Sequence, residues 1–460
     1  MQPDPAIVPA DVTAVLRTLG GAGKQAWLVG GAVRDVLRGV PAQDFDVATD
    51  ALPEQVAKLF PRVIPTGIQH GTVTVLSGEH KVEVTTFRGE GPYLDGRRPS
   101  SVTFLGDIDG DLARRDFTVN AVAWDPLAGT VRDPFSGLED LRRRRLRAVG
   151  DPLARFREDG LRPLRAVRFA STLRLAIDPA TRRAIPQTLD VFAKVAAERV
   201  REELIKLLVR GAPPSRGLRL LLRTGLLERI IPELLESVDF AQNRYHQWDV
   251  WRHTLRCVDA SPPDLVVRLG ALLHDVAKPR SAAPKEGAPG EHTFYDHEKI
   301  GARLAADILQ RLKFPRREIE RVALLVAEHN WHYQPEWNDA TVRRVLARIG
   351  PEELPALWAM RRADLIARGR FVEEGLANQE AAEARFQREI DRASALKVTD
   401  LALGGGDVMR ELGLGPGRQV GQILARLLER VIDDPDLNTP DALLRLLPEV
   451  VRELSTVNPQ

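Results

Sequence analysis

Strand signals are confined to the first third of the chain. Four short runs there are rich in β-branched or aromatic residues, and helical patterns separate them. Strands are expected at Ala26–Val29, Phe45–Ala48, Thr72–Leu76 and Val82–Phe87, and helices at Ala32–Arg38 and Pro53–Phe60. Beyond about residue 150, apolar residues recur at helical spacing. The pattern predicts an α+β chain with a mixed head (1–150), then an all-helical neck (151–235), body (236–385) and tail (386–460).

The composition is that of a globular protein with one concentrated basic region. Hydrophobic residues make up 43% of 460 residues and the formal net charge is only +2, so the chain is not a polycation. Ten arginines against three acids nevertheless lie between Arg142 and Arg168, which favours a local surface for a polyanion. The single cysteine, Cys257, excludes an internal disulfide and a cysteine metal cluster. Without a recognisable signal peptide or spanning segment, we expect a cytoplasmic protein with no membrane contact and no obligate protein partner.

The sharpest motif is Gly30-Gly31 at a predicted strand-to-helix turn, followed by Asp44 and Asp46. Paired glycines let the backbone approach a ligand closely, and the amides that open the next helix favour a phosphate. Two carboxylates two residues apart on a strand point to one side and repel each other unless a cation lies between them. Mg²⁺ suits that position because it takes oxygen ligands and shares its shell with nucleotide phosphates. The motif predicts metal-dependent phosphoryl transfer, with Glu83 or Asp116 as the third carboxylate.

These residues resemble the polymerase-beta-like nucleotidyltransferase superfamily, and within it the bacterial class II tRNA nucleotidyltransferases and their poly(A) polymerase relatives. The likeness continues through Arg114–Ala121, a motif that helps bind ribose and triphosphate in that family. It implies a polymerase-beta-like head, Mg²⁺ on Asp44 and Asp46, and template-free addition of CCA to the 3′ end of tRNA from CTP and ATP. The head residues that it assigns to nucleotide binding are Gly30, Gly31, Arg34, Arg115, Asp116 and Asn120.

A further motif, Glu158–Phe169, resembles the segment with which this family selects the incoming base. Asp159 and Arg162 are three residues apart, hence neighbours on a helical face. An acceptor and a donor placed there can meet the Watson–Crick edge of cytosine or adenine, because G and U would leave buried polar groups unpaired. Arg165 and Arg168 complete the nucleotide-binding set. The alternative is a plain surface ion pair between Asp159 and Arg162.

Three neighbouring features qualify this picture. Pro163 falls inside the motif, so the helix is expected either to begin near Asp159 or to be kinked. Residues 197–206 resemble the family's next helical motif and are expected to brace the recognition helix. The segment Gly91–Pro99 resembles a flexible loop that members need for the switch from C to A addition, so its presence favours complete CCA synthesis.

The helical half contains histidines and acids in the order of an HD-type phosphohydrolase domain. Ala271–Lys278, with His274-Asp275 at its centre, resembles the core of that domain. Imidazoles and carboxylates on helices can hold a divalent ion that activates water against a phosphoester, and Ni²⁺, Mn²⁺ or Co²⁺ is expected here. The resemblance implies metal ligands His253, His274, Asp275 and Asp364, with His297 and His329 in an outer layer. Some family members keep this fold without activity, so hydrolysis is a secondary expectation.

Two other functions remain open from the sequence. A poly(A) polymerase or an A-adding enzyme would have the same head, and these motifs do not separate full CCA addition from addition of A alone. HD phosphohydrolysis is the other alternative, with the head serving as a binding module. The presence of both Asp44 and Asp46 argues against that second alternative.

Overall fold

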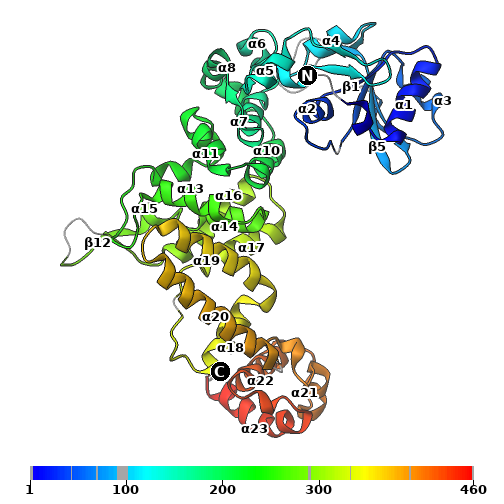
Figure 1. Ribbon diagram of the computed structural model, residues 1–460. Helices are drawn as coiled ribbons and strands as arrows, with labels where there is room; N and C mark the ends of the chain where they lie inside the picture. The colour runs from blue at the N-terminus through cyan, green and yellow to red at the C-terminus, as the bar shows by residue number, and fades with distance from the viewer. Residues whose placement is uncertain are drawn as a thin grey trace. The chain divides into compact units, whose positions relative to one another are not determined.

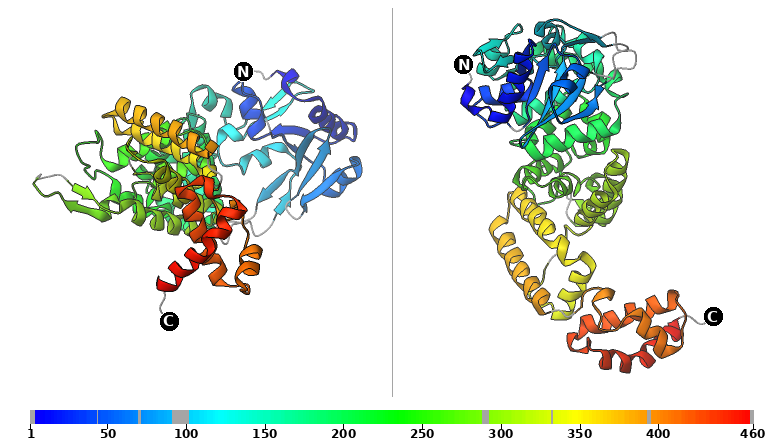
Figure 2. Two further views of the ribbon diagram at one scale, coloured as in Figure 1. Left: turned by 90° about the horizontal axis from the view of Figure 1, so that it is seen from below. Right: turned by 90° about the vertical axis from the view of Figure 1, so that its right-hand side faces the viewer.

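Figures 1 and 2 show a computed structural model that describes residues 4–42, 44–68, 71–90, 102–287, 292–331, 333–392 and 395–457. The chain divides into two compact units, Met1–Leu235 and Glu236–Gln460. The predicted α+β class is confirmed, while the finer boundaries at residues 150 and 385 stay predictions. None of the helices in these ranges has the length and apolarity needed to cross a bilayer. The loop Gly91–Pro99 lies outside the described residues.

The first unit is built on a seven-stranded mixed sheet with the order β3-β4-β5-β2-β1-β8-β9. Its strands are β1 (Ala26–Val29), β2 (Asp46–Thr49), β3 (Val63–Gly67), β4 (Thr72–Ser77), β5 (His80–Thr86), β8 (Ala123–Asp125) and β9 (Thr130–Arg132). Helices α1 (Ala10–Gly21) and α3 (Pro53–Leu59) pack on β4 and β5, and α2 (Gly31–Leu37) follows β1. The four predicted strands and two predicted helices are confirmed to within about two residues.

The rest of the first unit is mainly helical. Two further strands, β6 (Arg88–Glu90) and β7 (Val102–Phe104), pair with each other. The helices are α4 (Ile108–Ala113), α5 (Gly137–Arg142), α6 (Pro152–Glu158), α7 (Arg162–Thr172), α8 (Pro179–Ala184), α9 (Leu189–Phe192), α10 (Ala197–Arg210), α11 (Pro214–Arg223) and α12 (Leu226–Ile230). Helix α7 packs between α10 and α11, and Leu164, Val167 and Ala170 are fully buried.

Three short strands lie where only helices were expected, and a fourth, at the end of the mixed head, was not detected. Strand β10 (Arg145–Leu146) pairs in parallel with β11 (Ala176–Ile177), and β12 (Ala282–Pro284) pairs with the antiparallel β13 (His292–Phe294). Each strand has only two or three residues. An alternating pattern cannot develop over so few residues, so hydrophobic periodicity does not detect them.

The turn between α6 and α7 positions the predicted base-reading residues. Helix α6 ends at Glu158, Asp159 is extended, and α7 begins at Arg162. Pro163 therefore falls in the first turn, where the backbone N–H has no helical partner to lose, and no kink is needed. Between the helices, a Cβ on Gly160 would lie only 2.7 Å from the carbonyl oxygen of Val191. Glycine is thus the residue that lets this turn pack closely against α9.

The second unit is a helical bundle followed by a small helical tail. Helix α14 (Leu265–Leu273) is apolar on nearly every side and packs against α13, α17 and α19, which makes it the bundle's central helix. The bundle helices are α13 (Val250–Ala260), α15 (Lys278–Ser281), α16 (His297–Arg311), α17 (Arg316–Ala327), α18 (Asp339–Ile349), α19 (Leu354–Arg368) and α20 (Val372–Arg392). The tail, α21 (Gly405–Leu412), α22 (Arg418–Asp433) and α23 (Pro440–Val457), packs around its own apolar core.

Candidate functional site

One cavity of about 640 Å³ in the first unit gathers all but one of the predicted head residues. The residues that line it are Gly30, Gly31, Arg34, Asp44, Asp46, Arg115, Asp116, Asn120, Asp159, Arg162, Arg165 and Arg168. Glu83 is not in that lining. The cavity wall also contains Phe169, Arg199, Lys206 and Arg210, to which the sequence assigned no nucleotide contact. Phe169, Arg199 and Lys206 lie within motifs that the sequence singled out, but only the fold brings these side chains to the cavity.

Asp46 is the first residue of strand β2 and lies between two other acidic side chains, Asp44 and Glu83. It pairs across the parallel ladder with Glu83 on β5 and across the antiparallel ladder with Val29 on β1. Paired residues of adjacent strands point to the same face of a sheet, which brings Glu83 beside Asp46. Burial raises the pKa of Asp46 to about 6, against the effect of Arg115 and with the help of the Glu83 and Asp44 charges. Such a group of crowded oxygen ligands suits a hard divalent cation.

Gly30 approaches this group closely. Its φ is +71°, and a Cβ there would lie 3.1 Å from a guanidinium nitrogen of Arg115 and 3.2 Å from Oδ2 of Asp46. A side chain would therefore be strained by the backbone and would crowd the carboxylate. This local geometry agrees with the close backbone approach that the glycine pair predicted.

Asp116 has a different environment from Asp46. An Arg165 guanidinium nitrogen lies 2.7 Å from its Oδ2, and the Asn120 side-chain amide donates to its Oδ1 at 3.0 Å. Although burial opposes ionisation, Arg165 and Asn120 lower the pKa of Asp116 to about 2. This carboxylate already has a cation and a hydrogen-bond donor as partners. Asn120 in turn accepts from Arg34 at 2.8 Å, so the motif forms one connected network.

The expectation that Asp159 and Arg162 share a helical face is wrong. Asp159 lies before α7, and its carboxylate accepts two hydrogen bonds from Arg199 on α10, at 2.7 and 3.1 Å. The Arg162 guanidinium instead donates to Glu158 at 2.5 Å. The extended residue and the glycine turn break the helical spacing that the prediction assumed. Neither the joint helical face nor the alternative ion pair between these two side chains is found, although both residues line the cavity.

Helix α10 contacts the recognition helix as predicted for residues 197–206. Besides the Arg199 contact, the buried Glu203 lies 2.6 Å from Nε of Arg168 and 3.5 Å from Arg165. The Arg168 guanidinium also stacks 3.5 Å from the centre of the Phe169 ring. These contacts fix two arginines at the cavity wall, where a guanidinium can bind phosphate or a base edge.

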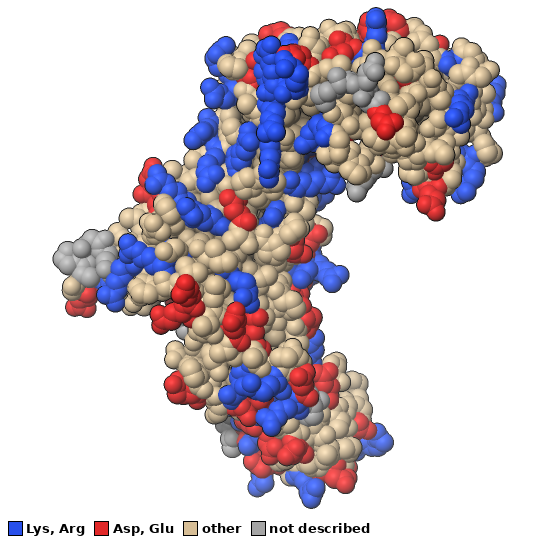
Figure 3. Space-filling model, in the orientation of Figure 1, with Lys and Arg blue, Asp and Glu red and all other residues tan. Residues whose placement is uncertain are grey.

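Basic side chains gather on the same unit. In Figure 3, Lys and Arg residues crowd the surface that α5 to α10 form. Exposed arginines there include Arg142, Arg143, Arg144, Arg157, Arg182 and Arg183. Glu139 neutralises part of this charge, since it pairs with Arg142 and Arg143. The rest remains a cationic surface on a nearly neutral chain.

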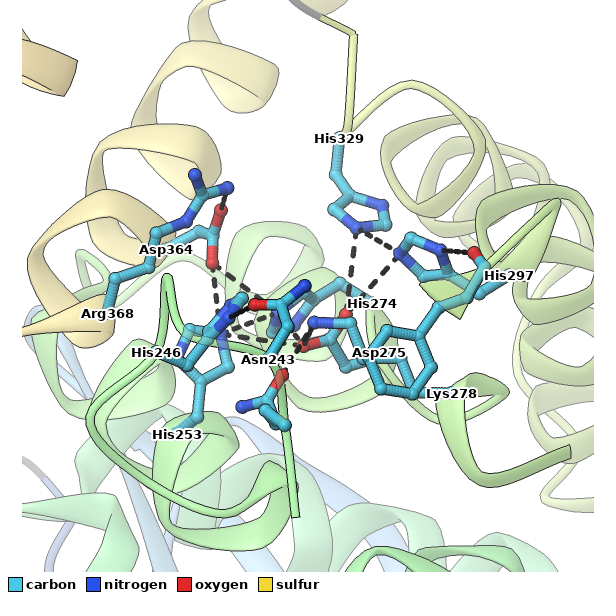
Figure 4. Close-up of polar contacts among 12 residues, drawn as sticks. Asn243, His246, His253, His274, Asp275, Lys278, His297, His329, Asp364 and Arg368 are labelled. Atoms are coloured by element: carbon cyan, nitrogen blue, oxygen red, sulfur yellow. Dashed lines mark hydrogen bonds and ion pairs between the residues drawn. The ribbon is translucent and has the colours of Figure 1, made fainter. Parts of the chain in front are cut away.

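The histidines and aspartates predicted in the second unit converge (Figure 4). His253 on α13, His274 after α14 and Asp364 on α19 form one cluster able to hold a metal ion. The His253 Nε2 lies 3.1 Å from His274 Nε2 and 3.0 Å from Oδ1 of Asp364. Asp275 lies beside this cluster, with its Oδ2 3.1 Å from His274 Nε2.

The assignment of His297 and His329 to an outer layer stays a prediction, and their geometry also allows a direct role. With Asp275 they form a second cluster able to hold a metal ion, their Nε2 atoms 3.2 Å apart and each 3.7 Å from Oδ1 of Asp275. Each Nδ1 is held at 2.7 Å by a backbone carbonyl, of Phe294 and Val326 respectively, which leaves Nε2 facing the site. Asp275 therefore lies between the two clusters, with one oxygen toward each.

Three of the four clustered histidines have the protonation state of metal ligands, while the Asp275 carboxylate raises the pKa of the fourth, His274, although burial opposes this shift. Burial lowers the pKa values of His253, His297 and His329, so neutral imidazoles prevail. Although burial disfavours the ionised carboxylate, His274 holds the pKa of Asp275 well below its usual range. Oδ2 of Asp275 is paired with Lys278 and His274, whereas the buried Oδ1 has no hydrogen-bond partner among the described residues and lies 3.7 Å from two histidine nitrogens. An ionised carboxylate left in this state is costly, and a bound cation would remove the cost. The residues therefore fit a divalent ion.

Three further side chains surround the clusters and were not assigned from the sequence. His246 lies edge-on to His253, with ring centres 5.0 Å apart, Lys278 Nζ is 2.8 Å from Oδ2 of Asp275, and Arg368 is 2.6 Å from Oδ2 of Asp364. All three line a cavity of about 590 Å³ that opens onto Asp275, His297 and His329. The i,i+4 spacing of Asp364 and Arg368 was the one sequence signal that could have found the arginine.

Three protein-family models match the chain. They are the poly A polymerase head domain over residues 26–147, the probable RNA and SrmB-binding site of polymerase A over 174–237, and the HD domain over 244–396. The CCA-adding enzyme of Levilactobacillus brevis is 46% identical over 251 residues, which are 55% of this chain and only 60% of that protein. The CCA-adding enzyme of Lactococcus lactis subsp. cremoris is 32% identical over 442 residues, 94% of each protein.

Similarity extends to a solved structure. The crystal structure of the Bacillus stearothermophilus CCA-adding enzyme in complex with CTP superimposes with a TM-score of 0.74 at 30% sequence identity. The superposition covers 97% of this chain and 98% of that one. Both units of the fold therefore have counterparts in that protein.

Proposed function

Because the chain belongs to the family of CCA-adding enzymes, we propose that it is a nucleotidyltransferase that adds CCA to the 3′ end of tRNA from CTP and ATP. The observation that carries the proposal is the cluster of three carboxylates, from Asp44, Asp46 and Glu83. It lies beside the Gly30 turn and an arginine-lined cavity. That combination provides ligands for a divalent cation and cationic partners for a triphosphate in one place.

The chemistry is transfer of a nucleotidyl group to the primer. The oxygen of the terminal 3′-hydroxyl bonds to the α-phosphorus of CTP or ATP as the bond from that phosphorus to the bridging oxygen breaks. Pyrophosphate leaves, and the hydroxyl proton is released. Mg²⁺ held by Asp44, Asp46 and Glu83 would acidify the hydroxyl and neutralise the leaving group. We favour Glu83 over Asp116 as third carboxylate, because Asp116 is already paired with Arg165.

The substrates follow from the charges around this cavity. Arg115 and the amides of the Gly30-Gly31 turn are placed to bind the triphosphate, since guanidinium groups and helix-opening amides favour phosphate. The exposed arginines of α5, α6 and α8 supply a surface for the phosphates of tRNA. Binding there should weaken as salt rises, because counterions are released on contact.

Asp159 is proposed to read the base, after release from Arg199. Its carboxylate would accept the exocyclic amine shared by C and A, a contact worth about 1.5–3 kcal/mol, or roughly ten- to a hundredfold in selectivity. We expect Asp159→Ala to incorporate C and A more slowly and to admit UTP or GTP. Single-nucleotide incorporation with each of the four triphosphates measures this.

Arg199→Ala is the matched variant for that experiment. It removes the partner of Asp159 but leaves the carboxylate, so it should retain the preference for C and A. If folded Asp159→Ala protein selects C and A as well as the unaltered protein, the carboxylate does not read the base.

A second activity is proposed for the second unit: hydrolysis of a phosphoester such as a 2′,3′-cyclic phosphate. The observation that favours it is the wholly buried Asp275 carboxylate between two histidine clusters, with Oδ2 paired to Lys278 and Oδ1 facing His297 and His329 at 3.7 Å. A divalent ion such as Ni²⁺, Mn²⁺ or Co²⁺ would supply an acidified water. Water oxygen bonds to phosphorus, the ester oxygen departs and takes a proton, and Lys278 and Arg368 at the cavity wall can balance the phosphate charge.

A further inference from the structure

A second cavity adjoins the metal-ligand clusters from the side of α19 and α20. Its volume is about 530 Å³, within the range of small-molecule sites. It shares His329, Asp364 and Arg368 with the cavity already described, so a molecule could lie in one and reach the clusters. Its wall is rich in aromatic side chains, among them Tyr245, Trp331 and Phe371. No part of the phosphoester chemistry proposed above uses these rings.

Two of the rings are exposed side by side. Tyr245 is 47% exposed and Phe371 is 63% exposed, and their ring centres lie 6.2 Å apart at an interplanar angle of 57°. Phe371 also has a φ of +54°, a conformation that a bulky residue adopts only at an energetic cost. Packing does not explain a phenylalanine there, because most of its surface is open to water. Strained backbone of this kind is concentrated at functional sites.

The third ring is part of a rigid wall. Trp331 stacks on Phe386, with ring centres 5.5 Å apart and planes 16° from parallel. The Arg361 guanidinium holds the backbone of two residues in this segment. It donates to the carbonyl oxygen of His329 at 2.5 Å and to that of Trp331 at 2.7 Å. The same arginine therefore ties the aromatic wall to a metal-cluster histidine.

Polar groups complete the cavity. The Arg370 guanidinium donates to the carbonyl of Arg244, and the Arg244 guanidinium lies 5.2 Å from the centre of the Tyr245 ring. Each exposed ring thus follows an arginine in the chain. Deeper in the wall, Nε1 of Trp331 and Oε1 of Gln379 are buried and have no hydrogen-bond partner among the residues that the structure describes. Exposed rings with neighbouring guanidinium groups are the means by which proteins bind unpaired bases.

We propose that this cavity binds the base of a nucleotide whose phosphate lies at the metal-ligand clusters, with Tyr245 and Phe371 as the stacking platform. The inference rests on the proposed hydrolytic function and names its substrate class: nucleotides with an unpaired base, free or at the 3′ end of RNA. A flat, polar-edged base suits both the rings and the unpartnered polar atoms, whereas a simple phosphoester would leave the cavity unused.

The test compares two cyclic phosphodiesters. Adenosine 2′,3′-cyclic phosphate has a base, and glycerol 1,2-cyclic phosphate has the same ring without one. Stacking of one base predicts that Phe371→Ala raises KM for the adenosine ester about 5- to 100-fold and leaves the glycerol ester unchanged. Phe371→Trp should restore the affinity. Ile366→Ala is the control, because Ile366 is a 46% exposed apolar side chain of α19 that lines neither cavity.

Binding of the adenosine ester to chelator-treated protein, measured by calorimetry, gives a readout that does not need hydrolysis. Phe371→Ala should weaken this binding by a similar factor. Equal binding by Phe371→Ala and unaltered protein, or an equal loss caused by Ile366→Ala, overturns the base site. If neither ester is hydrolysed, the hydrolytic function fails, and the binding measurement still decides the base site. The same binding measurement with an oligoribonucleotide that has a 2′,3′-cyclic end shows whether the site prefers a free nucleotide or the 3′ end of RNA.

Discussion

Asp46→Ala is expected to reduce nucleotide addition to tRNA by more than about a hundredfold. Loss of a residue that merely supports a metal ligand costs 10- to 100-fold, and loss of the ligand itself should cost more. Asp46 is the central carboxylate, beside Glu83 on the next strand and near enough to Asp44 for their charges to interact. Radiolabelled CTP incorporation into a tRNA transcript that lacks CCA measures the effect. Binding of the tRNA itself should change only a few-fold, because arginines rather than carboxylates contact its phosphates.

Two further variants make this result interpretable. Asp46→Asn keeps the size of the side chain and removes its charge, so it should lose addition as well. Asp190→Ala removes an exposed aspartate from α9 in the same unit and should leave addition unchanged. Near-normal incorporation by folded Asp46→Ala protein would remove this residue from the chemistry.

The second large effect is expected at Asp275. Asp275→Ala should abolish phosphoester hydrolysis with Ni²⁺, Mn²⁺ or Co²⁺ and spare nucleotide addition. The carboxylate lies between both histidine clusters, so its loss affects every pair of ligands there. The head residues belong to the other unit, which is why addition should persist. Release of the ring-opened product, followed by chromatography, measures hydrolysis.

Because removal of a buried carboxylate leaves Lys278 unpaired, Asp275→Asn is a milder companion that preserves volume. Asp307→Asn, on an exposed position of α16, is the control. A folded Asp275 variant that has lost both activities would contradict the assignment of the two reactions to separate sites. Hydrolysis that persists in both Asp275 variants would place the reaction elsewhere.

Hydrophobic patterning along the chain predicted those strands of the head that are long enough to show such a pattern. Strands β1, β4 and β5 are runs of four to seven residues with a buried apolar face, and they were placed to within about two residues. Strands β8 and β9 have three residues each and were not detected. The pairing of Asp46 with Glu83 depends on which strands become neighbours, and spacing along the chain does not determine that.

The same limit of local sequence patterns applies to the site residues. Residue chemistry and motif order identified candidate site residues, and twelve of the thirteen predicted catalytic and nucleotide-binding residues line one cavity. The predicted geometry of Asp159 and Arg162 was wrong, because a turn at Gly160 separates Asp159 from helix α7, which begins only at Arg162. The approach of His297 and His329 to Asp275 could not be predicted from spacing, since it arises only when α14, α16 and α17 pack together. Residues such as Arg199 enter the site through tertiary contact alone.

Sequencing the products of three tRNA transcripts tests the central claim most directly. The transcripts end at the discriminator base, after the first C and after both Cs, and each is incubated with the purified protein, CTP, ATP and Mg²⁺. The account predicts that all three acquire the same CCA end and that extension then stops. Addition of A only to the transcript ending in CC, a run of A residues on any transcript, or no addition at all would contradict it.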